Sequence, residues 1–419
     1  MPLVNAHTLD NGCRVFFRPT PGKRILAIVL NIAWGGRDDP AELAGRSKLM
    51  SSLLTKGTER RSAYQIAYEM ENVGGSIESY CTPDVMGLEA QVEETDWPLA
   101  LDIMGDCLLH PVFDAYEFEK EKTLLRAQLN RMEDQKFPFS YKHFLELFYE
   151  NHPYAVPASG DVETLDAITP DMPGSMHSAV VRPDRCVISV VGNVPEAEFL
   201  ECLEKIWAGY QQSEKPLDRC DTTALPGHGL GKLREVKRDF EQGMVLMGYR
   251  FPLPGDPHTA PARMVSGILG EGMASRLFVE LREKAHLAYS VGCSYVPRQI
   301  GAHCLLHIGT GPDTVDQARD AMEAEARGLL KNPPDEAEIE RARQYILGKH
   351  LISRQTNIAL AHSISNSETL GLGWEYSENY PDRIQAVTAD DIQKLAADHL
   401  QDPAILILRP SRNSQAQDA

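Results

Sequence analysis

Two segments of this chain recur in the same order about 220 residues later, and this repetition constrains the fold more than any other feature. Residues 113–121 (Phe-Asp-Ala-Tyr-Glu-Phe-Glu-Lys-Glu) match residues 334–342 (Pro-Asp-Glu-Ala-Glu-Ile-Glu-Arg-Ala), and residues 165–172 match residues 384–391. The two offsets are 221 and 219 residues. In the first pair, an Asp and the acidic residues after it are typical of the start of a helix. One such match can arise by chance, but two at nearly one offset indicate a duplicated chain.

Strand and helix patterns alternate through both halves. Apolar, β-branched runs predict strands at residues 25–32, 87–92, 186–192, 244–249 and 404–408. Helical patterns lie between them, for example at residues 64–73 and 314–330. We therefore predict an α+β fold of two homologous domains, residues 1–212 and 233–419, joined by a Pro- and Gly-containing linker at residues 213–232.

Composition narrows the classes of partner. The chain has 419 residues, 42% of them hydrophobic and 24% charged, and a net charge of −18. Such an acidic protein repels nucleic acid and anionic membranes, so we expect neither as a partner. The eight cysteines are scattered without a Cys-x-x-Cys pair, which predicts buried free thiols. The first residues lack a signal-peptide pattern and no apolar run reaches ~20 residues, so we expect a cytoplasmic location.

Residues 45–58 (Gly-Arg-Ser-Lys-Leu-Met-Ser-Ser-Leu-Leu-Thr-Lys-Gly-Thr) form the most informative motif. This frame resembles the active-site helix of the pitrilysin/insulinase metallopeptidases, peptidase family M16. In active members the helix carries His-x-x-Glu-His, in which the two His bind zinc and the Glu activates water. The matching positions here are Lys48, Ser51 and Ser52. An ammonium group has no lone pair and a neutral hydroxyl is a poor zinc ligand, so we expect no metal here.

A second helix lacks the third zinc ligand. The family places a ligand Glu seven residues after another Glu; this chain keeps the first as Glu121 but has Gln128 at the ligand position. Further segments agree with the family in order and spacing, namely residues 35–39, 72–75 and 152–154, Gly160 and Asn193. The resemblance thus runs through nearly the whole chain, and it implies that each domain is a mainly antiparallel sheet flanked by helices.

The second half departs less from the family. Residues 270–278 form a glycine-rich turn that enters a helix, and residues 280–290 follow. There the family carries an Arg and a Tyr seven residues apart that contact the substrate backbone opposite the zinc, and the match is Arg282 and Tyr289. A guanidinium fork and a phenol hydroxyl can both donate to a peptide oxygen. The alternatives are a solvated Arg282 paired with a neighbouring acid such as Glu280 or Glu283, and an ordinary strand aromatic at Tyr289.

Other candidate sites are weaker. His303 and His307 have the spacing of helical zinc ligands, but alternation and flanking glycines predict a strand, which separates the two rings by ~13 Å. Residues 227–232 lack the phosphate-loop spacing and fall in the predicted linker. Cys293 has no evident activating base, so a strand thiol is favoured over a nucleophile.

The resemblance implies that two different subunits contribute to one active site. Heterodimeric bacterial members of the family split the zinc site and the Arg/Tyr pair between two subunits. We predict the non-catalytic subunit, which completes a substrate chamber with a zinc-bearing paralogue and binds peptides through Arg282 and Tyr289. Zinc is expected in the partner, and whether this chain is itself an enzyme stays open. The alternatives are a non-enzymatic scaffold, a peptide-binding homodimer, and a hydrolase with unrecognised chemistry.

Overall fold

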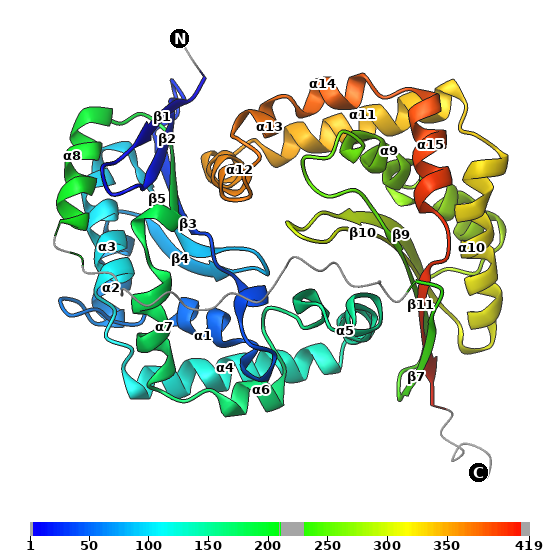
Figure 1. Cartoon of the computed structure of the whole chain (residues 1–419), viewed down its shortest axis with the longest axis horizontal. Coiled ribbons are helices and arrows are strands. Elements are labelled where there is room, and N and C mark those ends of the chain that lie inside the picture. Colours follow the sequence, from blue (N-terminus) through cyan, green and yellow to red (C-terminus); the bar gives the residue numbers. More distant parts are fainter. Residues whose placement is uncertain (1–2, 209, 211–229, 412–419) are drawn as a thin grey trace. The chain divides into compact units, whose positions relative to one another are not determined.

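The computed structural model describes residues 3–208, 210 and 230–411, which form two compact units. Unit 1 contains the described residues within Met1–Asn130, Val156–Asp221 and Ile352–Ser377. Unit 2 contains those within Arg131–Ala155, Thr222–Leu351 and Glu378–Ala419. Each unit is built around one sheet (Figure 1). Residues 213–229 of the predicted linker lie outside the described residues.

The unit 1 sheet has the strand order β1-β2-β6-β3-β5-β4. The bounds are Asn5–Thr8 (β1), Arg14–Arg18 (β2), Cys186–Val191 (β6), Ile25–Ile32 (β3), Met86–Glu93 (β5) and Ser76–Cys81 (β4). β2 and β6 pair in parallel, and the other neighbours pair antiparallel, with Leu30 opposite Leu88 across β3 and β5. The helices α6 (Val162–Ala167) and α7 (Met172–Val180) and the turn η5 (Pro183–Arg185) precede β6.

The unit 2 sheet repeats this topology with the order β7-β11-β8-β10-β9. The bounds are Leu233–Arg238 (β7), Ala404–Pro410 (β11), Gly243–Arg250 (β8), His303–Thr310 (β10) and Ser290–Val296 (β9). β7 and β11 pair in parallel and the rest antiparallel, as β2, β6 and their neighbours do in unit 1. The matching strand orders agree with a duplication, and the predicted α+β fold with mainly antiparallel sheets is confirmed.

One face of each sheet carries the main core. In unit 1, Leu88 and Ile188 pack with Met104 of α3 (Trp97–Leu109) and Phe199 of α8 (Glu196–Trp207). In unit 2 the core draws on α9 (Thr259–Gly270), α10 (Val315–Lys331), α11 (Glu336–Ser353), α14 (Tyr380–Gln385) and α15 (Ala389–His399). Shorter elements are η3 (Glu94–Asp96), η4 (Pro153–Ala155), η7 (Pro312–Thr314) and α13 (Glu375–Glu378).

The other face of each sheet is covered by a helix from the opposite half of the sequence. α12 (Asn357–Thr369) packs on β3 and β6 of unit 1, where Leu360 and Ile364 meet Val29 and Val187. α12 is drawn in orange in Figure 1, whereas the strands it covers are blue and green. Asn31 Nδ2 also donates to Asn366 Oδ1 at 2.9 Å. The sequence did not predict this exchange.

The helix α5 (Lys136–Tyr149) makes the reciprocal packing in unit 2, on β8 and β11. Phe144 and Phe148 are fully buried against Leu246 and Leu305. A Cβ on Gly248 would lie 2.2 Å from Phe144 Cζ, so the missing side chain at Gly248 allows α5 to approach the sheet. Each buried phenylalanine contributes about 2 kcal/mol of hydrophobic stabilisation.

The repeated sequence segments correspond to repeated helix starts. Asp114 Oδ1 accepts from the amide of Tyr116 at 2.9 Å before α4 (Ala115–Glu133), and Asp335 Oδ1 accepts from the amide of Glu338 at 2.8 Å in α11. Such capping satisfies amides that have no partner within the helix. No helix in the described part of the chain has the length and apolar character needed to span a bilayer.

Candidate functional site

The helix α1 (Arg46–Leu53), which matches the family's active-site helix, lies in unit 1 and begins at Gly45 with φ 97°. A Cβ on Gly45 would lie 2.7 Å from the Ser159 carbonyl oxygen. Gly160 has φ 67°, and a Cβ there would lie 2.1 Å from the Ala44 oxygen. Two glycines therefore allow the chain near residue 160 to pass against the start of α1. This explains why Gly160 belongs to the family pattern.

Asp39 fixes the first turn of α1. Between β3 and α1 the chain forms two short turns, η1 (Gly36–Asp38) and η2 (Ala41–Leu43). Oδ2 of Asp39 accepts from the Ser47 amide at 2.9 Å, and Oδ1 accepts from Ser47 Oγ at 2.7 Å. Arg46 Nε lies 3.5 Å from the same carboxylate. Burial raises the pKa of Asp39 to about 6, although the bonds from Ser47 and Arg46 lower it.

The three positions that match the zinc motif lie on one side of α1. Ser51 Oγ donates to the Tyr80 carbonyl oxygen of β4 at 2.8 Å, and Ser52 Oγ donates to the Leu49 carbonyl oxygen at 2.9 Å. Lys48 is half-buried one turn before Ser52. The two hydroxyl groups are thus used within the fold, and the third group is a cation. These residues do not fit a zinc ion.

Leu49 and Leu53 lie on an adjacent side of α1 and pack in one cluster with Leu125 and Leu129 of α4. On α4, Gln128 is exposed, whereas Glu121 is only 9% exposed and pairs with Lys56 Nζ at 3.2 Å. The carboxylate that the chain retains is therefore already paired with a cation. Among the residues that the structure describes, no group of three His, Cys, Asp or Glu side chains is placed to hold a metal.

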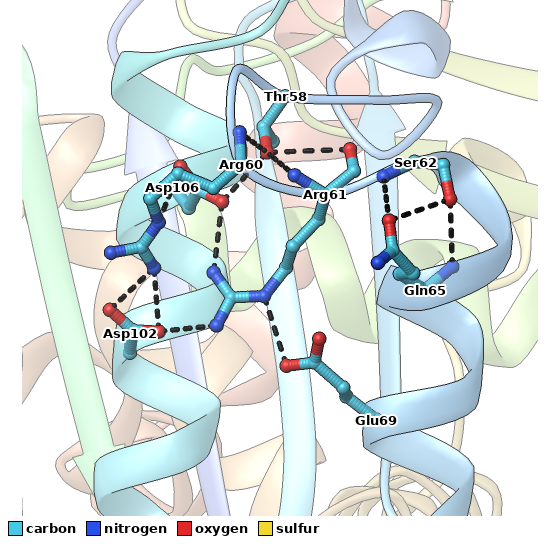
Figure 2. A network of polar contacts seen from close by, with 8 residues as sticks. All are labelled: Thr58, Arg60, Arg61, Ser62, Gln65, Glu69, Asp102 and Asp106. Atoms are coloured by element: carbon cyan, nitrogen blue, oxygen red, sulfur yellow. Dashed lines mark hydrogen bonds and ion pairs between the residues drawn. The ribbon is translucent and has the colours of Figure 1, made fainter.

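A partly buried ion network fixes the turn that follows α1 (Figure 2). Arg61 donates to Asp106 Oδ2 at 2.9 Å, to Asp102 Oδ2 at 2.6 Å and to Glu69 Oε2 at 3.0 Å. Thr58 Oγ1 also donates to Asp106 Oδ2, at 2.7 Å. Asp102 and Asp106 belong to α3 and Glu69 to α2 (Ala63–Asn72), so the network joins three elements. The end of the degenerate helix is thus rigidly supported.

The predicted substrate-binding residues lie in unit 2. Arg282 is on the short π-helix η6 (Phe278–Lys284), and Tyr289 immediately precedes β9. η6 packs against β9, so the two elements are neighbours. Leu277 and Leu281 are buried and anchor η6, and Arg276 is held by both oxygens of Glu338 at 2.7 and 2.8 Å.

Arg282 and Tyr289 both present their polar groups to solvent. The Arg282 guanidinium lies 4.9 Å above the Phe278 ring, and Glu280 pairs with Lys284 at 2.7 Å rather than with Arg282. Within the described chain Arg282 forms no ion pair. Tyr289 is 62% exposed, and its amide donates to the Gly309 carbonyl oxygen at 2.9 Å. Arg282 is solvent-exposed on a helix, as its alternative has it, but it pairs with no acid among the described residues. Tyr289 adjoins strand β9, so its substrate-binding role and the alternative of an ordinary strand aromatic both stay predictions.

The weaker candidates have structural roles. His303 and His307 lie on strand β10, as predicted; Nδ1 of His303 is 2.9 Å from the Tyr149 hydroxyl, and His307 packs against Phe137. Cys293 is buried in β9 with its sulfur 3.2 Å from that of Cys304. The seven described cysteines are free, five of them buried, whereas Cys81 and Cys202 are half-buried and Cys220 lies outside the described residues.

Comparison of the sequence with models of known protein families shows which family the chain belongs to. Residues 14–161 match the insulinase family, peptidase family M16, and residues 168–346 match the peptidase M16 inactive domain. The chain belongs to peptidase family M16. The first match includes residues 35–39 and Gly160, two of the motifs that supported the resemblance.

One relative matches nearly the full length of this M16 chain, and another matches about two thirds of it. An uncharacterized zinc protease, YmxG, of Bacillus subtilis is 26% identical over 415 residues, which cover 98% of this chain and 99% of that protein. An uncharacterized zinc protease of Mycobacterium leprae is 30% identical over 288 residues, 68% of this chain and 64% of that protein.

Solved structures share the fold. A protease from Helicobacter pylori has a TM-score of 0.90 at 18% identity, over 98% of this chain and 100% of that chain. A peptidase M16 inactive domain from Pseudomonas fluorescens has a TM-score of 0.88 at 18% identity, over 97% of this chain and 98% of that chain.

Proposed function

We propose that this M16 chain is the non-catalytic subunit of a heterodimeric zinc metallopeptidase. It would pair with a paralogue that carries His-x-x-Glu-His, complete the substrate chamber, and bind the peptide through Arg282 and Tyr289. The zinc and the activated water would belong to the paralogue. This chain would contribute binding and stabilisation of the transition state, and no metal ligand.

The observation that carries this proposal is a contrast between two motifs of the chain: the positions of the zinc motif do not fit a metal, whereas the frame around Arg282 is intact. Lys48, Ser51 and Ser52 do not fit zinc, yet the helix that bears them keeps its glycine contacts, its Asp39 cap and its partly buried ion network. The frame around Arg282 is intact, and its guanidinium has no acidic partner among the described residues. The exposed Arg282 guanidinium is therefore available to a ligand.

The local chemistry favours an extended peptide as the ligand. β4 and β9 are the end strands of their sheets in the described chain, so each has main-chain groups on one side that no neighbouring strand pairs. On β9 one of these groups, the Tyr295 amide, donates to Ser266 Oγ of α9. Peptides often bind by adding a strand to such an edge. Arg282 offers several donors to a peptide carbonyl, and the Tyr289 hydroxyl can donate to the same oxygen as negative charge develops on it.

Co-purification with the paralogue tests the subunit assignment. The two chains expressed together should form a stable complex and cleave unstructured peptides, and the activity should require both chains and be lost with a chelator. Cleavage by the paralogue alone at the rate of the mixture would refute the assignment. A homodimer of this chain that binds peptide without the paralogue would instead favour the peptide-binding alternative.

Substitution in the complex tests the two residues. Arg282→Ala combined with Tyr289→Phe should lower kcat/KM at least about ten-fold, since loss of one oxyanion donor costs about 10²-fold in rate. The matched control is Arg327→Ala with Tyr64→Phe, which alters an exposed arginine paired with Glu323 and an exposed tyrosine. Equal rates for both double variants would remove Arg282 and Tyr289 from the mechanism.

A further inference from the structure

A cationic side chain that the sequence analysis did not single out lies beside Tyr289. Lys136 is the first residue of α5 and belongs to unit 2 with β9 and β10. Its Nζ donates to Gln242 Oε1. An ammonium group has three donors, so two remain. Within the described residues, Lys136 has no carboxylate partner, although the chain has 60 acidic residues against 42 lysines and arginines.

The lysine and a serine converge on the same space above the sheet. Ser290 and Gly309 are directly opposite each other across β9 and β10. A Cβ placed on Gly309 would lie 2.7 Å from Ser290 Oγ and 3.3 Å from Lys136 Nζ. Ser290 Oγ and Lys136 Nζ therefore both lie against Gly309, and the missing side chain at Gly309 is what allows the two donors to come together. An oxygen placed against both groups can accept a hydrogen bond from each.

The chemistry of this space suits an anion. Burial lowers the pKa of Lys136, because its charge is poorly solvated and no carboxylate compensates it. Gln135, which precedes α5, makes no side-chain cap, so the positive end of the helix dipole adds to the same field. His307, on the same face of β10, has a pKa lowered by burial and is neutral at pH 7.

The position links this space to the proposed peptide site. The Tyr289 amide donates to the carbonyl of Gly309, and Ser290 is the next residue along the chain. Successive residues of a strand point to opposite faces, so Tyr289 and Ser290 address the two faces of the same edge. A peptide along β9 would likewise direct alternate side chains to the two faces. Ser290 is small and exposed, and a long acidic side chain can extend over it.

We propose that Lys136 and Ser290, which meet at Gly309, bind a carboxylate of the peptide, and that this subsite selects for acidic peptides. The inference rests on the proposed peptide-binding function and specifies the substrate class of that site. The carboxylate belongs either to a Glu or Asp side chain or to the C-terminus of the peptide. The chemistry at Lys136 is the same in both cases.

Peptide binding by the full-length chain, alone and with its paralogue, tests the subsite. The probes are labelled unstructured peptides of about ten residues, in which Glu or Gln is scanned along the sequence and the C-terminus is either free or amidated. At least one Glu/Gln pair, or the free/amide pair, should differ about ten-fold or more in Kd in favour of the carboxylate. Which pair differs identifies the source of the carboxylate.

Three variants assign the preference to this space. Lys136→Met should abolish the difference and leave the Kd of the Gln or amide peptide within about two-fold. Gly309→Ala should reduce the difference while the lysine is retained, because the methyl group would lie 2.7 Å from Ser290 Oγ and displace it. Lys142→Met is the matched control on the same helix, since Lys142 pairs with Glu133 at 3.0 Å, and it should change nothing.

The possible results separate the two proposals. If no peptide binds, the proposed peptide-binding function fails and the subsite fails with it. If peptides bind without any preference for a carboxylate, or keep the preference in Lys136→Met, the subsite alone is refuted. If Lys136→Met weakens the binding of acidic and neutral peptides equally, the lysine has a structural role only.

Discussion

At the scale of single residues, Asp39 makes the stability of this protein depend on pH. Its pKa is raised to about 6 in the fold by burial, against about 3.9 in an unfolded chain. The folded state therefore binds the proton more tightly than the unfolded state. The stabilisation from this proton is complete below about pH 4 and is lost as the pH rises through about 6, a change on the order of 2–3 kcal/mol.

The variant Asp39→Asn should remove this dependence of the free energy of unfolding on pH. The introduced amide cannot ionise, so the free energy of unfolding of the native protein should fall relative to that of the variant as the pH rises from about 4 to about 7. Urea unfolding at several pH values measures the difference. Asp166→Asn, at an exposed carboxylate paired with Arg126, is the control. Parallel curves for the native protein and Asp39→Asn would contradict the assigned pKa.

The role of a residue was predictable from the sequence where the chemistry of its side chain alone decides that role. An ammonium at position 48 and hydroxyls at positions 51 and 52 exclude zinc ligation without any coordinates. The environments of Asp39 and Lys136 were not predictable, because burial and the meeting of Lys136 with Ser290 at Gly309 depend on contacts between distant segments. A lysine at the start of a helix rich in aromatic residues was the available signal for Lys136.

At the scale of elements, the turn between α1 and α2 depends on Arg61. The Arg61 side chain is 12% exposed and that of Asp106 is 1% exposed, so removal of the arginine leaves the buried Asp106 with Thr58 and the more exposed Arg60, whose Nε lies 3.4 Å away. Arg61→Met should cost about 2 kcal/mol of stability. Arg126→Met, which breaks a pair with side chains 39% and 51% exposed, should cost much less. Equal urea midpoints for the two variants would show that the network in Figure 2 contributes little.

Local patterns identified most elements but not their packing partners. The predicted strand at residues 25–32 coincides with β3, and the predicted helix at residues 314–330 lies within one residue of α10. The assignment of α5 to unit 2 and of α12 to unit 1 was not predictable, because an amphipathic pattern shows that a face is buried and not which sheet covers it. Both sheets offer apolar faces of similar character, so only tertiary packing decides.

At the scale of the whole molecule, the exchange of α5 and α12 couples the two halves of the sequence. Unit 1 is incomplete without residues Ile352–Ser377, and unit 2 is incomplete without Arg131–Ala155. The predicted domains 1–212 and 233–419 follow the duplication in the sequence, and neither contains all of a compact unit. Residues 1–212 expressed alone should therefore expose the apolar face of Val29, Val187 and Val191 that Leu360 and Ile364 cover, and should aggregate or remain partly unfolded.

A cut between the halves provides the sharpest test of this coupling. A protease site introduced at residue 220 and cleaved in the folded protein should leave two fragments that co-elute in native buffer and separate only in denaturant, because each fragment still supplies a helix to the other unit. The weakened variant Asn31→Ala with Ser189→Ala removes three hydrogen bonds to α12, those to Asn366 Oδ1, to Thr369 Oγ1 and to the Ala361 carbonyl oxygen. Each is worth about 1 kcal/mol, so the cleaved variant should dissociate at a lower urea concentration than the cleaved native chain. Fragments that separate in native buffer, each with intact secondary structure and cooperative unfolding, would show that each half of the sequence folds by itself and that the helix exchange does not hold the halves together.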